Sequence, residues 1–334
     1  MKPGKRFYKH PSLPAAAIVV LTGLLAVPTT IVLTAAGANQ PPTESTDADR
    51  IFGNPTNLGM TVNSSAREFG PSISADDLSL YFTSRRPGGS GGTDLWMTTR
   101  KTKADPWGTP MNLGPTVNSS TIDGGPSISA DGLSLYFSSD RPGGHGAKDL
   151  WVTTRKTTSD PWGEPVNLGP KVNSSACEHA PSISADGLSL YFSEQRGPFR
   201  PGGLGNNDIW VTTRKTKDGP WGTPVNLGPT VNGTTKEGVP SISADGLTLY
   251  LISSRPGGSG KDDLWVTTRQ TTSDPWGAPA NLGTTINSPR WDLSPDISSD
   301  GSTLYFASDR RGAVGGSGDF DIWQVSLKAP GEKE

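Results

Sequence analysis

Short apolar runs separated by polar turns recur along most of this chain. Leu-Ser-Leu-Tyr-Phe occurs at 133–137 and again at 188–192, and Asp-Leu-Trp-Val-Thr-Thr-Arg occurs at 149–155 and again at 263–269. Such brief runs, bounded by turn residues, are typical of β-strands, and no segment keeps up the 3.6-residue apolar period of an amphipathic helix. The pattern predicts an all-β domain.

The runs belong to a tandem repeat. Pro-Ser-Ile-Ser begins at residues 71, 126, 181 and 240, Pro-Asp-Ile-Ser follows at 295, and Trp-Gly-x-Pro-x-Asn-Leu-Gly begins at 107, 162, 221 and 276. Each unit contains four short predicted strands. A hairpin turn, which is Asp-Gly at 131–132, 186–187 and 245–246, follows the first strand, and a Gly-rich loop follows the second. A unit of this size has too little core to fold alone, so the units must stack as blades around an axis.

The two ends of the repeat region are complementary. Residues 52–59 are an extra copy of the fourth-strand motif, and the last unit stops after its third strand at 321–325. Pairing these ends would remove the free sheet edges. We therefore predict a five-bladed β-propeller of four-stranded blades over residues 51–328, in which the N-terminal strand completes the last blade and residues 329–334 form a tail.

The segment before the repeats differs in kind. Basic residues within the first nine positions precede an apolar stretch at about 14–38, and Ala36-Gly37-Ala38 has the form of a cleavage site. Residues 1–38 are therefore predicted to be a signal peptide or an N-terminal membrane-anchor helix, and 39–50 a polar linker. Either alternative places the propeller outside the cytoplasm, in the periplasm or at the cell surface.

The repeat resembles the WD40-like repeats of the TolB β-propeller family. The motif that carries the resemblance is clearest at 126–151, and the similarity extends over about residues 52–327. The resemblance implies an extracytoplasmic interaction module, and similar propellers also accompany hydrolase domains. The chain departs from TolB in having five units where TolB has six and no room for its N-terminal α/β domain, so we do not transfer TolB's partners.

Composition narrows the classes of function. The 334 residues include 30 Lys and Arg against 32 Asp and Glu, with no basic face, which argues against nucleic acid as a partner. Cys177 is the single cysteine, so an intrachain disulfide cannot form. We expect a monomer without a cofactor or metal. Calcium at the Gly-rich segment 315–321 is an open alternative, since that segment resembles calcium-binding Gly/Asp repeats.

Two charged positions recur in every unit and are expected near one mouth of the central channel. The acids are Glu68, Asp123, Glu178, Glu237 and Asp292, and the basic residues are Arg86, Arg141, Arg196, Arg255 and Arg310. Two interpretations stay open, a framework of Arg–carboxylate hydrogen bonds or a funnel that binds a cationic group. The recurring Asn of Val/Ile-Asn and the Asp that opens each third strand are expected to satisfy backbone groups of the loops.

Positions that differ between blades are better candidates for binding, because the framework does not require them. Those predicted to lie on the channel-mouth face, together with the shared acids, are Arg67, Phe69, Cys177, His179, Lys236, Trp291, His145 and Phe199, the last in a longer loop of blade three. An exposed tryptophan could stack on a sugar or anchor a peptide. Cys177, His179 and His145 could also form a metal site or a Cys–His nucleophile, although their spacing gives no convergence.

We therefore predict a binding or scaffold module that contacts another protein through the channel-mouth face, without enzymatic activity and with no catalytic residue assigned. The alternative is a carbohydrate-active enzyme or a lectin-like glycan binder that uses the channel-mouth carboxylates. The membrane attachment of the N-terminal segment depends on whether that segment is cleaved.

Overall fold

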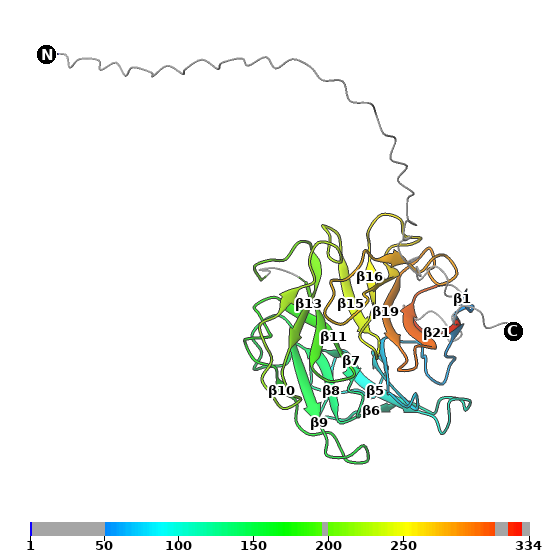
Figure 1. Ribbon diagram of the computed structural model, residues 1–334. Coiled ribbons are helices and arrows are strands. Elements are labelled where there is room, and N and C mark those ends of the chain that lie inside the picture. Colours follow the sequence, from blue (N-terminus) through cyan, green and yellow to red (C-terminus); the bar gives the residue numbers. More distant parts are fainter. Residues whose placement is uncertain (2–50, 196–199, 311–319, 329–334) are drawn as a thin grey trace, which may run out of the picture. The chain divides into compact units, whose positions relative to one another are not determined.

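The computed structural model describes Met1 and residues 51–195, 200–310 and 320–328, which form β-strands and connecting turns without a helix. Every strand lies in the unit Ser45–Glu334. Its strands form five antiparallel sheets that radiate as blades from a central axis (Figure 1). The predicted all-β, five-bladed propeller is thus confirmed.

The blades follow one another along the chain. Blade one is β3 (Glu68–Ile73), β4 (Ser79–Ser84), β5 (Asp94–Thr99) and β6 (Met111–Asn112). Blade two is β7 (Asp123–Ile128), β8 (Ser134–Ser139), β9 (Asp149–Thr154) and β10 (Val166–Asn167). Blade three is β11 (Cys177–Ile183), β12 (Ser189–Gln195), β13 (Asn207–Thr213) and β14 (Val225–Asn226). Blade four is β15 (Glu237–Ile242), β16 (Thr248–Ser253), β17 (Asp263–Thr268) and β18 (Ala280–Asn281).

Blade five contains both ends of the domain, as predicted. Its sheet consists of β19 (Asp292–Ile297), β20 (Thr303–Ser308) and β21 (Asp321–Lys328), completed by β1 (Ile51–Phe52) and β2 (Thr56–Asn57). Asn57 is opposite Trp323 and Phe52 is opposite Leu327, so β1 lies beside β21 (Figure 1). The opening strands therefore supply the outer edge of the last blade.

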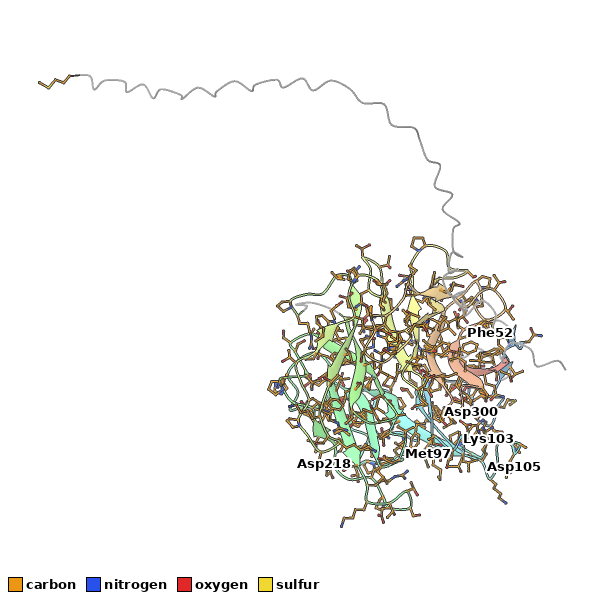
Figure 2. The ribbon with its side chains drawn as sticks, in the orientation of Figure 1. Phe52, Met97, Lys103, Asp105, Asp218 and Asp300 are labelled. Carbon is orange, nitrogen blue, oxygen red and sulfur yellow. The ribbon has the colours of Figure 1, made fainter. Side chains whose placement is uncertain are left out.

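The first strands of the blades form a closed circle around the axis. β3 contacts β7, β7 contacts β11, β11 contacts β15, β15 contacts β19, and β19 contacts β3. A second contact joins these blades at the face of the propeller where the first strands end. There, Lys103 Nζ of blade one lies 2.8 Å from a carboxylate oxygen of Asp300 in blade five (Figure 2). The seam between the first and last blades is thus joined at the axis, at this loop and at the outer edge.

The hydrophobic core lies between neighbouring blades. Between blades one and two, Tyr81 and Leu95 pack with Leu135 and Phe137, and all four are buried. The Tyr81 and Trp162 rings meet edge to face with centroids 6.3 Å apart, a favourable aromatic geometry. Each blade therefore buries its apolar face only against the next, which is why the repeats cannot fold singly.

Two strand boundaries differ from the sequence prediction. The first strands begin three residues before their Pro, or four in blade three, because the backbone there bonds to the previous blade, as in Asp123 N to Thr93 O at 2.9 Å. The fourth strands have only two residues, since Pro precedes them without an N–H donor and a glycine such as Gly114, at φ 81°, turns the chain just after them.

The predictions for residues 2–50 and 329–334, including the signal or anchor helix and the linker, lie outside the described residues. No helix long and apolar enough for a membrane span occurs in the part of the chain that the structure describes.

Candidate ligand site in the axial channel

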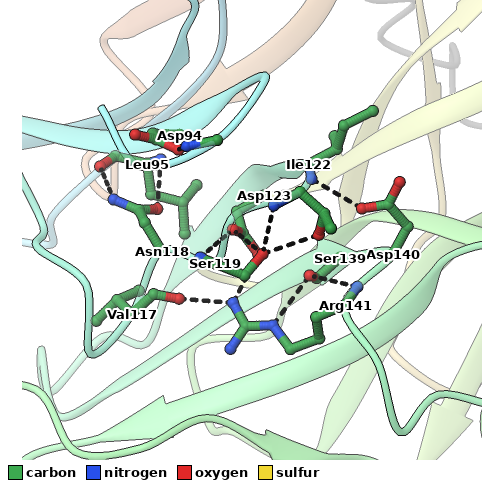
Figure 3. Close-up of polar contacts among 12 residues, drawn as sticks. Asp94, Leu95, Val117, Asn118, Ser119, Ile122, Asp123, Ser139, Asp140 and Arg141 are labelled. Carbon is green, nitrogen blue, oxygen red and sulfur yellow. Dashed lines mark hydrogen bonds and ion pairs between the residues drawn. The ribbon is translucent and has the colours of Figure 1, made fainter. Parts of the chain in front are cut away.

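The five recurring acids are buried and paired, which supports the framework interpretation. Asp123 is 0 % exposed and accepts hydrogen bonds from Ser119 N at 2.6 Å, Ser119 Oγ at 2.8 Å and the Arg141 guanidinium at 2.6 Å (Figure 3). Glu68, Glu178, Glu237 and Asp292 are equally buried, each with an Arg ion pair. None of them is open to a ligand in the channel.

The arginines that pair with these acids also hold the loops of their own blades. Arg141 donates to Val117 O at 2.6 Å, and its guanidinium carbon lies 5.3 Å from the centroid of the Trp151 ring. Arg86, Arg255 and Arg310 repeat this arrangement. The guanidinium thus ties a buried acid, a backbone carbonyl and a core tryptophan together.

In blade three the sequence prediction chose the wrong arginine. Arg200 makes the ion pair with Glu178, at 2.7 Å, and the same guanidinium pairs with the buried Glu194. Arg196, the predicted residue, and Phe199 lie outside the described residues. The reason is an insertion after β12, which moves the Arg-Pro-Gly-Gly motif four residues along the chain. Burial raises the pKa of Glu178, while Ser174 and Arg200 oppose that effect.

The other recurring polar residues satisfy backbone groups, as predicted. Asn118 exchanges two hydrogen bonds with the backbone of Leu95, at 2.8 and 3.0 Å. Asp149 accepts from the N–H groups of His145 and Gly146 in the Gly-rich loop, at 2.7 and 3.0 Å. Their roles are structural and leave the blade-specific residues as the candidates for binding.

Blade-specific residues converge on a cavity at the axis. This axial cavity has a volume of about 290 Å³, and the predicted residues that line it are Arg67, Phe69, His179 and Lys236. They come from blades one, three and four, so the propeller closure is what brings them together.

A bulge in each first strand shapes the axial cavity. The strand register shifts just before the recurring Pro of each blade, and the residue there has a positive φ, 60° at Gly125 and 49° at Ala180. A Cβ at Gly125 would lie 3.3 Å from Ala180 Cα, so neighbouring blades approach closely at this level. Bulges redirect side chains, and here the side chains between the acid and the Pro line the axis.

Asp296 stands at the base of the axial cavity and was not identified from the sequence. It lines both this cavity and a smaller one on the opposite side of the ring. Burial, with the charge of Asp77, raises the pKa of Asp296 from 3.8 to about 8, against the hydrogen bonds from Ile73 N and the Ser241 hydroxyl. The carboxyl group lies deep in the molecule, whereas Asp296 as a whole is only partly buried. At pH 7 it is largely a neutral proton donor.

Asp296 takes the place of a serine in an otherwise regular ring. In four blades a serine hydroxyl accepts a hydrogen bond at 3.1 Å from an isoleucine N–H of the next blade; these serines are Ser72, Ser127, Ser182 and Ser241. In blade five Asp296 takes this role and accepts from Ile73 N of blade one at 2.7 Å. The sequence signal was the single change from Pro-Ser-Ile-Ser to Pro-Asp-Ile-Ser. Lys148, just before the third-strand Asp of blade two, also lines the cavity and was missed.

Three of the blade-specific residues predicted from the sequence do not join the axial cavity. Cys177 is a buried thiol within β11, and His145 is exposed in the Gly-rich loop of blade two. Trp291 lies in an adjoining groove, half-buried, with its ring 6.2 Å from that of Phe320 and 3.6 Å from Lys261 Nζ. Within the described ranges, His, Cys, Asp and Glu side chains form no group that could hold a metal ion. Most of the predicted calcium segment, 315–319 out of 315–321, lies outside the described residues.

No protein-family model and no curated protein matches the chain. Its fold is shared by TolB from Acinetobacter baumannii, at 18 % identity and a TM-score of 0.50, covering 81 % of this chain and 57 % of that one. An α-L-arabinofuranosidase from Lactobacillus brevis matches at 15 % identity and a TM-score of 0.51, covering 80 % and 92 %. Zg3597, a family 117 glycoside hydrolase of Zobellia galactanivorans, matches at 12 % and 0.51, covering 83 % and 90 %.

These likenesses confirm the TolB-like propeller at the level of the fold, and the chain spans a little over half the length of that TolB. They also correct one prediction. The prediction that the protein has no enzymatic activity is wrong, since glycoside hydrolases share this fold over nearly their whole length. The fold is therefore as compatible with a carbohydrate-active protein as with a scaffold.

Proposed function

We propose that this protein is an exported carbohydrate-active β-propeller that holds the end of a glycan chain in its axial cavity. The observation that carries the proposal is a cavity on the propeller axis with Asp296, a carboxyl that is neutral at pH 7, at its base. The N-terminal segment supports a location in the periplasm or at the cell surface.

The dimensions and lining of the cavity suit a terminal sugar. Its volume of about 290 Å³ lies at the lower end of the roughly 300–1,000 Å³ that small-molecule sites span. Phe69 offers an apolar ring on which the C–H face of a sugar can pack, while Ser138, Gln195 and His179 offer groups for its hydroxyls. A cavity of this size takes one or two sugar units, with the rest of the chain outside.

Glycoside hydrolysis is the second candidate, favoured by the raised pKa of Asp296. A general acid must hold its proton at the working pH, and a pKa of about 8 meets that requirement. The usual two-carboxylate mechanism needs a second acid about 5–10 Å away. The channel-mouth acids named from the sequence are buried against arginine, so they do not support that role.

A glycan array probed with the full chain tests the proposal, followed by assays for newly released reducing ends on every glycan retained. We expect retention of a defined glycan class, and F69A should lower it at least tenfold while V166A, on the exposed outer strand β10, leaves it unchanged. D296N separates the candidates, because a general acid contributes roughly 10²–10⁴-fold to the rate and its loss would abolish cleavage without abolishing binding. A chain that neither retains nor cleaves any glycan overturns the proposal.

A further inference from the structure

The axial cavity is strongly basic for a protein with a nearly neutral net charge. Arg67, Lys148 and Lys236 line it, one each from blades one, two and four. Asp296 is the one acidic residue that lines it within the described ranges, and below its pKa of about 8 the carboxyl does not neutralise them. Arg67 and Lys236 occupy the same position in their blades, directly before the recurring acid, where the other three blades carry uncharged residues. Lys148 occupies a position at which no other blade carries a basic residue.

The three basic groups are held in different ways. The Arg67 guanidinium carbon lies 4.4 Å from the Phe320 ring centroid and 5.2 Å from that of Phe69, so aromatic contacts position it. Lys236 Nζ lies 2.5 Å from a carboxylate oxygen of Asp262, which compensates its charge. For Lys148, by contrast, no acid among the described residues forms an ion pair, and its backbone is fixed by Lys148 O accepting from Glu178 N at 3.0 Å.

We infer that the axial cavity selects an acidic sugar, a uronic-acid unit at the end of a glycan, and that the ammonium of Lys148 binds the sugar carboxylate. The inference rests on the proposed function and names the class of glycan. A carboxylate in the cavity meets the Arg67 guanidinium and the Lys148 ammonium from two different blades, and their partial burial strengthens a charge-assisted hydrogen bond. A neutral sugar would leave the Lys148 charge uncompensated.

Calorimetry with trigalacturonate and its neutral counterpart galactotriose tests this inference. We expect the acidic trisaccharide to bind at least tenfold more tightly, because a hydrogen bond to a charged group contributes about that factor or more. K148M, which keeps the length of the side chain, should lose most of the difference, and K148R should retain it. K156M is the matched control, since Lys156 is an exposed lysine just beyond the other end of β9.

The outcomes separate the inference from the proposed function. Equal binding of both trisaccharides, unaffected by K148M, overturns the inference while glycan recognition stands. Binding of a triglutamate peptide in preference to either sugar overturns both. The inference is supported if the preference for trigalacturonate disappears in K148M and survives in K148R and K156M. The preference should also weaken between 50 and 500 mM NaCl, since salt screens charge.

Discussion

Replacing Asp296 by serine should stabilise the protein at alkaline pH. Four blades already carry serine at this position, and each of those hydroxyls accepts from an isoleucine N–H of the next blade at 3.1 Å. A serine at 296 can accept from Ile73 N in the same way. The substitution therefore removes a buried ionisable group and keeps the contact that closes the ring.

The size of the effect follows from the raised pKa. In the unfolded chain the Asp296 carboxyl ionises near 3.8, and in the folded protein near 8. Between these values the folded state holds a proton that the unfolded state has lost. The contribution of this carboxyl to the free energy of unfolding is therefore fully present below about pH 4, falls as the pH rises, and levels off above 8. Each pH unit is worth about 1.36 kcal/mol, so the loss between pH 5 and 9 is at most about 4 kcal/mol. Water in the channel reduces it, and we expect about 2–3 kcal/mol.

Urea unfolding of the wild type and D296S at pH 5, 7 and 9 measures this difference directly. Other titrating groups contribute equally to both proteins and cancel. D300S is the control, because Lys103 lowers the pKa of the Asp300 carboxyl, whose contribution to stability is lost only as the pH falls below about 4. Wild type and D296S with parallel pH profiles would refute the account of Asp296 as a buried, protonated acid.

Two further substitutions test the framework. D123A leaves the Arg141 guanidinium, only 12 % exposed, without its acid and should cost about 3–5 kcal/mol in urea unfolding. K217A breaks the exposed ion pair between Lys217 and Asp131 and should cost less than about 1 kcal/mol. Equal costs would contradict the role given to the acid ring. N57A removes the amide of β2 that donates to Asp321 at 2.8 Å and should cost about 1–3 kcal/mol, while T56A on the same strand should change little. A neutral N57A would mean that the seam does not limit stability.

The propeller could be predicted from the sequence because its cause is local and repeated. The same turn and strand residues occur in every unit, and the unmatched motif at 52–59 could pair only with the incomplete last unit. The lining of the axial cavity was predicted in part, because residues flanking a recurring acid must lie at the same level of the ring. Arg67, Phe69, His179 and Lys236 meet at the axial cavity for that reason.

The remaining site residues depend on features that spacing alone does not reveal. Whether Glu68 or Asp123 faces the channel or the blade interior is decided by side-chain direction, and both turn inward to arginine. Arg196 was chosen over Arg200 because an insertion preserved a nearby arginine. Asp296 was visible as a change of motif, but its altered acidity comes from burial, which only the assembled ring produces.

Closing the ring through β1 and β2 has a consequence for biosynthesis. The first strands to leave the ribosome must wait for β21, the last, before blade five can be completed. Until about residue 328 has been made, the nascent chain has an open sheet edge and an unfinished core at the seam. The domain can therefore reach its native state only after translation of the repeats is complete.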